Sequence, residues 1–247
     1  MITKIFIIES LPNNELQTGE ELFNNTINND QFKDSTINSQ LIKVNDKDEL
    51  FTCLTHIERD ISDSDEVIVQ IEAHGNNNEM GLKNSQTVTW KELTKYLIPI
   101  NKKCRNKLHL NLATCYSMHA GLSIDLKLTA PYKTYISTIE KIKIYEIMED
   151  NKILYKYIMD KKELFPAYLE FMKERPTSKF RIKDVMTVLD YHLKPNLLKF
   201  LQEGSDFLVK SFFEPYLNIE IDLKELEASN DKVEYVMSLF KKRFIFE

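Results

Sequence analysis

Apolar and polar positions form alternating blocks along the first half of the chain, and these blocks predict strands and helices in turn. Four short runs rich in Ile, Val and Leu are typical of buried strands: residues 2–8, 41–44, 67–73 and 108–113. Apolar residues recur at helical spacing over residues 46–61, with Asp46 as a candidate N-cap, and over residues 90–100. We therefore expect an α/β fold with a mostly parallel sheet and helices on both faces.

Smaller elements fill the spaces between these blocks. Residues 15–24 have weak helical character, and the Asn-rich residues 24–39 favour a loop. Residues 80–88 predict a small hairpin, and a further strand is expected within residues 131–142. Ser117 is a candidate N-cap for a helix over residues 116–128.

The C-terminal part of the chain has a different pattern, which is helical throughout. Residues 182–193 and 196–213 have helical apolar spacing, Pro195 and Pro215 are expected to interrupt it, and Asp231 is a candidate cap for a last helix. No Gly/Ser-rich linker precedes this part. We therefore divide the chain into an α/β domain, residues 1–175, and a helical extension, residues 176–247, packed on the same domain.

Two chemically reactive side chains follow directly on two of the predicted strands. His74-Gly75 follows residues 67–73, and Thr114-Cys115 follows residues 108–113. In doubly wound sheets, functional residues gather at the carboxyl ends of the strands. If these two strands are parallel neighbours, His74 and Cys115 lie side by side and form a candidate Cys-His dyad.

The residues around this pair fit nucleophilic catalysis. A thiol attacks as the thiolate, which a nearby imidazole or helix amino terminus favours. Gly75 allows close approach of a substrate carbonyl, and its N–H and that of Cys115 are candidates for an oxyanion hole. The sequence thus predicts Cys115 as nucleophile and His74 as general base and acid.

The two segments VIVQIEAHG (67–75) and LHLNLATC (108–115) resemble the caspase-like cysteine peptidases, which include caspases, metacaspases and bacterial CHAT-type proteases. The resemblance covers roughly residues 1–175. It implies a caspase-like fold, with His74 and Cys115 as the catalytic residues and Gly75 as an oxyanion donor. It also implies a single-chain endopeptidase of the CHAT kind, without a metal or organic cofactor, acting as a switched effector in bacterial defence or cell death with a regulatory protein partner.

One departure from the family concerns substrate binding. Two residues before the nucleophile, caspases have Gln and metacaspases have Asp, whereas this chain has Ala113. Side chains alternate along a strand, so Glu72 is expected near Ala113, where it would supply a displaced negative charge for Lys or Arg at the P1 position. The alternative is that Glu72 is a buried carboxylate paired within the fold and that Ala113 opens an apolar pocket.

Composition restricts partners and compartment. The chain has 33 basic and 38 acidic residues, a net charge of −5, and no basic tract, so nucleic acid is not an expected partner. The apolar run at the start is too short for a signal peptide or a membrane span. Cys53, Cys104 and Cys115 lack disulfide-framework spacing, and Cys104 lies in a basic segment where we expect exposure. We expect a cytoplasmic protein with reduced thiols.

Two other function classes remain open. A catalytically silent protein could use the same fold as a protein-binding adaptor. A metal-binding regulator could use His74, Cys115 and His119, since Cys-x3-His on a helix presents two ligands on one face. No further ligand pair in the sequence supports the metal site.

Overall fold

The computed structural model describes residues 1–29, 36–203, 205–217, 221–223 and 229–246. Part of the loop expected over residues 24–39 lies outside these ranges. The chain divides into two compact units, Met1–Ile124 with Pro131–Lys183, and Asp125–Ala130 with Asp184–Glu247. The expected boundary at residue 175 falls inside the first unit, because the residues that follow it include a strand of the sheet. That the C-terminal part packs on the first unit stays a prediction.

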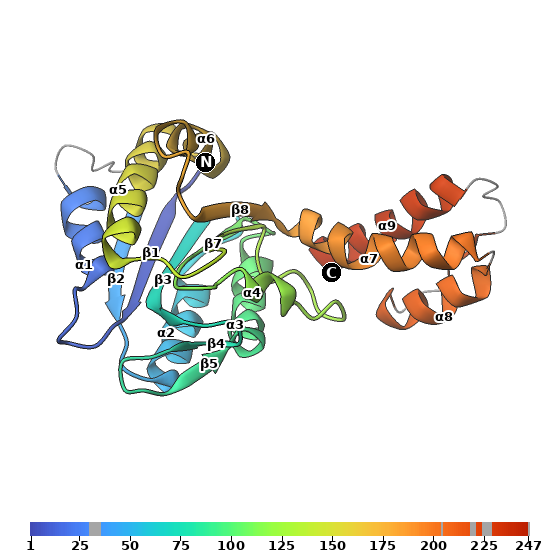
Figure 1. Ribbon diagram of the computed structural model, residues 1–247, viewed down its shortest axis with the longest axis horizontal. Helices are drawn as coiled ribbons and strands as arrows, with labels where there is room; N and C mark the ends of the chain where they lie inside the picture. The colour runs from blue at the N-terminus through green and yellow to red at the C-terminus, as the bar shows by residue number, and fades with distance from the viewer. Residues whose placement is uncertain (30–35, 204, 218–220, 224–228, 247) are drawn as a thin grey trace. The chain divides into compact units, whose positions relative to one another are not determined.

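A mostly parallel sheet forms the centre of the first unit (Figure 1). Its strands follow the order β2-β1-β3-β6-β7-β8, and every pairing from β2 to β7 along this order is parallel. Their bounds are β1 Lys4–Ser10, β2 Asn38–Lys43, β3 Val67–Gly75, β6 Leu108–Ala113, β7 Thr134–Thr138 and β8 Phe180–Asp184. The expected α/β class and parallel sheet are confirmed. The sequence prediction missed β8, because it assigned Ile182 to a helix.

A small antiparallel hairpin continues from the end of β3. It consists of β4 (Glu79–Gly81) and β5 (Thr87–Thr89), and β4 pairs with the last two residues of β3. The expected hairpin at residues 80–88 is therefore confirmed. β3 extends through His74 and Gly75, so the histidine lies within a strand.

Helices cover both faces of the sheet, as expected (Figure 1). On one face, α1 (Thr18–Leu22) with the π-helical turn η1 (Phe23–Ile27) packs against α5 (Ile144–Lys161), which packs against α6 (Leu164–Glu174). On the other face, α2 (Lys47–Asp60) packs against α3 (Trp90–Lys103), and the short α4 (His119–Leu122) lies beside α3. The crossover from β1 to β2 and the crossover from β2 to β3 run in opposite directions across the sheet. When both are right-handed, α1 and α2 lie on opposite faces.

Local sequence explains where α2 and α3 begin. The Asp46 carboxylate accepts a hydrogen bond from the Glu49 N–H at 2.9 Å, which confirms the expected N-cap. Thr89 caps α3 in a reciprocal capping box with Glu92. The apolar stripe of α3, Trp90, Leu93 and Leu97, is buried against the sheet as its spacing predicted.

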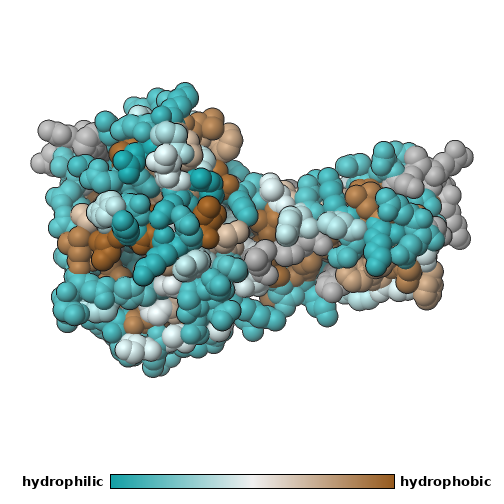
Figure 2. Space-filling model, viewed as in Figure 1, coloured by the Kyte–Doolittle hydropathy of each residue, from teal (hydrophilic) through white to brown (hydrophobic). Residues whose placement is uncertain are grey.

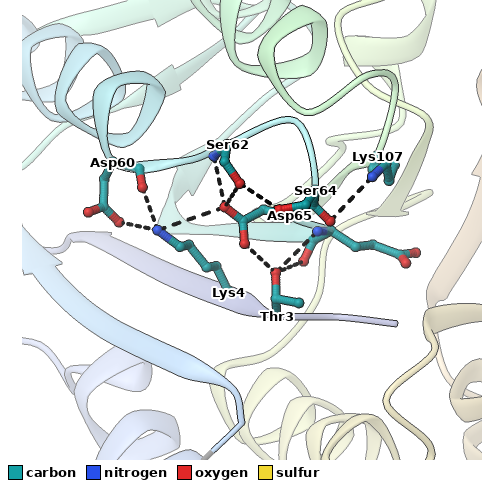
Figure 3. A network of polar contacts seen from close by, with 8 residues as sticks. Thr3, Lys4, Asp60, Ser62, Ser64, Asp65 and Lys107 are labelled. Carbon is teal, nitrogen blue, oxygen red and sulfur yellow. Dashed lines mark hydrogen bonds and ion pairs between the residues drawn. The ribbon is translucent and has the colours of Figure 1, made fainter.

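The amino ends of the strands are joined by a polar network (Figure 3). Thr3 donates to Asp65 at 2.8 Å, and the Lys4 ammonium lies 2.8 Å from the Asp60 carboxylate. Lys107 donates to the carbonyl oxygens of Asp63 and Ser64. These contacts fix β1, β3 and β6 in register at the edge opposite to His74 and Cys115.

The second unit contains three helices among the described residues, α7 (Val185–Gln202), α8 (Asp206–Leu217) and α9 (Ser229–Phe246). Its centre is aromatic, with the Phe213 ring 5.5 Å from that of Phe240. Pro195 and Pro215 lie inside α7 and α8, so the expected interruptions are wrong. A proline removes one backbone hydrogen bond, and here the helices continue through it.

The face seen in Figure 2 is mostly hydrophilic, with separate apolar side chains between the polar ones. Among the described residues, no helix combines the length and apolar character needed to cross a membrane.

Candidate active site

His74 and Cys115 lie at neighbouring strand ends. β3 and β6 pair in parallel from Val67 with Leu108 to Glu72 with Ala113, so His74 and Cys115 each follow two residues after the last pair. The two ends touch at Gly75, where an added Cβ would lie 2.7 Å from the Cys115 carbonyl oxygen and 3.0 Å from the Thr114 Cβ. The structure thus confirms the expected parallel neighbours and the level placement of Glu72 and Ala113.

The His74 imidazole is open to solvent on one side and held by a carboxylate on the other. Its side chain is 58% exposed, and its Nε2 lies 2.9 Å from Oε2 of Glu15. Glu15 comes from the loop between β1 and α1, and our sequence analysis did not identify it. The sequence does show a carboxylate in the segment after β1. It can be linked to His74 only when β1 is known to lie next to β3.

The Cys115 side chain is half-buried at the edge of the core. Its thiol donates a long hydrogen bond to the Ile142 carbonyl oxygen, with Sγ and O 3.7 Å apart. Tyr116 follows with a φ of 56°, in the left-handed region, so the chain turns sharply after the thiol. This turn presents the sulfur at the end of β6.

Buried hydroxyl groups fix the turn that carries Cys115. The Ser117 hydroxyl donates to the Leu112 carbonyl oxygen at 3.1 Å and accepts from the Thr138 N–H at 2.9 Å. The Thr138 hydroxyl donates to the Thr114 carbonyl oxygen at 2.5 Å. The residues on both sides of Cys115 are therefore tied to β6 and β7, and such support holds a reactive group in place.

The helix expected over residues 116–128 is wrong. Residues 116–118 form turns, and α4 (His119–Leu122) is a single short turn of helix. Ser117 does not act as an N-cap, because its hydroxyl bonds to the strands. The expected helix amino terminus is therefore not present directly after Cys115, since the first helical residue is His119.

The backbone N–H of Gly75 is directed away from the hairpin. The Asn76 N–H donates to the Glu79 carbonyl oxygen at 2.9 Å, which makes Asn76 and Glu79 a hydrogen-bonded pair. Because pair types alternate along an antiparallel ladder, the next pair, Gly75 with Met80, is non-hydrogen-bonded. The expected oxyanion role of the Gly75 and Cys115 N–H groups stays a prediction, and this geometry leaves the Gly75 N–H unused by β4.

Glu72 and Ala113, the candidate substrate-binding residues, are both 1% exposed. The Glu72 carboxylate accepts from the Thr18 hydroxyl at 2.8 Å, from the Asn151 amide at 3.1 Å and from the Gln70 amide. Ala113 packs in the apolar core beneath α5. This geometry favours the alternative expectation, a carboxylate paired within the fold. A direct contact with substrate would require this cluster to open.

Burial gives Glu72 a testable effect on stability. Desolvation raises the pKa of Glu72 to about 7, against the hydrogen bonds from Thr18 and Gln70. The folded protein then holds this proton more tightly than the unfolded chain. The proton's contribution to the free energy of unfolding is therefore full at low pH and is lost as the pH rises through about 7. From pH 5 to pH 8 we expect the free energy of unfolding to fall by roughly 2.5 kcal/mol on account of this group.

Urea unfolding of the wild type and of Glu72→Gln at both pH values measures this effect. The amide cannot titrate, so the stability difference between the two proteins should change with pH by the stated amount. An equal pH dependence in the two proteins would contradict the assignment.

The three cysteines differ in accessibility. Cys53 and Cys104 are buried, whereas Cys115 is half-buried. The expected exposure of Cys104 is wrong, because its side chain packs inward while its charged neighbours face solvent. Burial raises the pKa of the Cys53 thiol to about 12 and also raises the pKa of Cys104.

Alkylation should therefore select Cys115. We expect iodoacetamide to modify Cys115 in the folded protein at neutral pH, and Cys53 and Cys104 only after unfolding, since a buried neutral thiol is unreactive. Peptide mass spectrometry after timed quenching gives the three rates. Comparable rates at Cys53 and Cys115 under native conditions would contradict this prediction.

Among the described residues, no group of three or more His, Cys, Asp or Glu side chains is placed to hold a metal ion. The alternative in which Cys115 and His119 share one helix is wrong, because Cys115 lies in the turn and α4 begins at His119.

Comparison of the chain with protein-family models and with curated protein sequences found no match.

Proposed function

We propose that this chain is a cysteine endopeptidase with a caspase-like fold, in which Cys115 is the nucleophile and His74 the general base and acid. The observation that carries the proposal is the contact between the end of β3, which carries His74, and the end of β6, which leads to Cys115. The half-buried thiol of Cys115 contrasts with the two buried ones, which supports a reactive role.

The topology supports the resemblance seen in the two sequence segments. The His-Gly pair ends a central strand and leads into a hairpin, a helix and the neighbouring strand that delivers the cysteine. This is the chain order that the resemblance to caspase-like peptidases implies. Roles as a switched effector in defence, and a regulatory protein partner, rest on that resemblance.

The proposed reaction begins with transfer of the Cys115 thiol proton to His74. The thiolate attacks the carbonyl carbon of the scissile peptide bond, and the N–H groups of Gly75 and Cys115 bind the resulting oxyanion. As the C–N bond breaks, the imidazolium gives its proton to the leaving amine and a thioester remains. His74 then takes a proton from water, the hydroxide attacks the thioester, and the acid product leaves as the thiol is restored.

The buried position of Glu72 bears on the substrate. Because its carboxylate is bonded within the fold, we propose that an apolar P1 residue is favoured over Lys or Arg. A basic preference that disappears in Glu72→Gln would instead support the charge hypothesis.

A series of labelled electrophilic peptide probes, varied at P1, tests the proposal. We expect covalent labelling at Cys115, located by mass spectrometry, with stronger labelling for Leu or Met than for Lys, Arg or Asp at P1. Cys53→Ala and Cys104→Ala are the matched controls and should label as the wild type does. Labelling by iodoacetamide without labelling by any peptide probe, together with no cleavage of a peptide library, would favour the silent adaptor.

A further inference from the structure

The loop that joins β1 to α1 brings a carboxylate onto the imidazole of the proposed dyad. Oε2 of Glu15 lies 2.9 Å from Nε2 of His74, a hydrogen-bonding distance. The Glu15 side chain is 31% exposed, so the contact is partly shielded from water. Since Nε2 is bonded to Glu15, Nδ1 is the ring nitrogen left for the thiol.

The turn that carries Glu15 is fixed by its own hydrogen bonds. The Glu15 N–H donates to the Pro12 carbonyl oxygen at 3.0 Å. The Gln17 side-chain amide donates to the carbonyl oxygens of Pro12 and Glu15, at 2.9 and 3.1 Å. The Glu15 backbone therefore has little freedom, and the carboxylate meets the ring without first ordering a mobile loop.

Buried carboxylates fix the far end of the same loop. The Glu9 carboxylate accepts from the N–H groups of Gly19 and Glu20, at 2.7 and 3.2 Å. The Thr18 hydroxyl donates to Glu72 at 2.8 Å. Glu9 and Glu72 are paired residues of β1 and β3, so the loop is attached to the same strand that carries His74.

We propose that Glu15 is a positioning residue for His74, which selects the ring tautomer and stabilises the imidazolium formed when Cys115 loses its proton. The inference rests on the proposed peptidase function and adds a third member to it. The carboxylate accepts the Nε2–H bond and stays ionised, while the thiol proton moves from Sγ to Nδ1. No atom of Glu15 touches the substrate.

The residues that surround His74 on the neighbouring elements agree with this role. β4 places glycine, Gly81, opposite His74, and the end of β6 supplies Cys115. Glu72 lies two residues earlier on the same face of β3, with its carboxylate bonded to Thr18, Gln70 and Asn151. Glu15 is therefore the carboxylate in hydrogen-bonding contact with the ring.

Alkylation of Cys115 tests the inference without knowledge of the substrate. The second-order rate of iodoacetamide modification at Cys115 is measured from pH 4 to pH 10 for the wild type and for Glu15→Gln, which keeps the shape and removes the charge. We expect the variant profile to move to higher pH and the rate near pH 6 to fall about tenfold, the factor that corresponds to loss of one charged hydrogen bond. A purely structural role would lower stability and leave this profile in place.

Glu21→Gln is the matched control. It makes the same change in α1, on a carboxylate that bonds Asn25 and not His74, and its profile should equal that of the wild type. Glu15→Asp should restore part of the wild-type profile, because it returns the charge on a shorter side chain. Once a peptide substrate is known, Glu15→Gln should lower kcat at nearly unchanged KM.

The outcomes separate the two proposals. If His74→Ala leaves the wild-type alkylation profile unchanged, the dyad itself is wrong and the role of Glu15 falls with it. If His74→Ala changes the profile and Glu15→Gln does not, the dyad stands and the positioning role is overturned. Faster alkylation in Glu15→Gln also overturns it, since Glu15 would then withhold the imidazole from the thiol.

Discussion

Cys115→Ala is expected to abolish peptide cleavage, with a loss of at least about 10⁴-fold in kcat/KM. The variant keeps the turn that Ser117 and Thr138 fix, but it has no atom that can attack the carbonyl. Cys115→Ser is a closer match in shape and should also be inactive at this level, because a hydroxyl is a far weaker nucleophile without strong activation. His74→Ala should lower the rate by about 10² to 10⁴-fold, the usual contribution of a general base and acid.

The measurement is release of a fluorescent amine from the best peptide found with the probe series. Both side chains lie at the surface or at the edge of the core, so the free energy of unfolding should change by less than about 1 kcal/mol. Undiminished cleavage by Cys115→Ala would contradict the assignment of Cys115 as the nucleophile. Cleavage that is lost equally in Cys53→Ala would point to a general loss of fold.

Gly75→Ala is expected to lower kcat/KM by about 10² to 10³-fold, although residue 75 carries no reactive group. The added Cβ would lie 2.7 Å from the Cys115 carbonyl oxygen, closer than any ordinary contact. The methyl group would belong to the last residue of β3, and the oxygen belongs to the turn after β6, which hydrogen bonds hold to β7. The methyl group must therefore push these two segments apart. This displaces the Gly75 N–H from the Cys115 N–H, and the proposed oxyanion hole loses its geometry.

Gly81→Ala is the matched control for that variant. Gly81 pairs with His74 from β4, and its added Cβ would lie 3.7 Å from the His74 Cβ, an ordinary contact. We expect Gly81→Ala to stay within a few-fold of the wild type and Gly75→Ala to lose about 1 to 3 kcal/mol of stability through overpacking. Near-wild-type cleavage by Gly75→Ala would show that the strand ends are not the oxyanion site.

The strands and the larger helices could be predicted because their signals are local. The run from Leu108 to Ala113 matches β6 at both ends, because its leucines alternate with polar residues at the two-residue period of a strand. Asp46 predicted the start of α2 because capping involves residues three positions apart. The placement of His74 and Cys115 at strand ends came from the same local patterns.

Long-range contacts decided the features that the sequence analysis missed or left open between alternatives. Glu72 is buried, and its hydrogen-bond partners Thr18 and Asn151 come from α1 and α5, far from it in sequence. Cys104 has charged neighbours in sequence, but its own side chain is buried at the C-terminal end of α3. Ser117 was a candidate N-cap, but its hydroxyl accepts a hydrogen bond from Thr138 on β7 instead.

The sequence by itself determined the α/β class of the fold and the placement of His74 and Cys115 at the ends of two neighbouring strands. The tertiary structure decided that Glu15 meets His74, because this contact requires β1 to lie next to β3, an order that no local pattern contains. It also decided which thiol is accessible, since burial depends on what the rest of the chain packs over each cysteine. Local propensity places residues on elements, and packing between elements determines which of them can react.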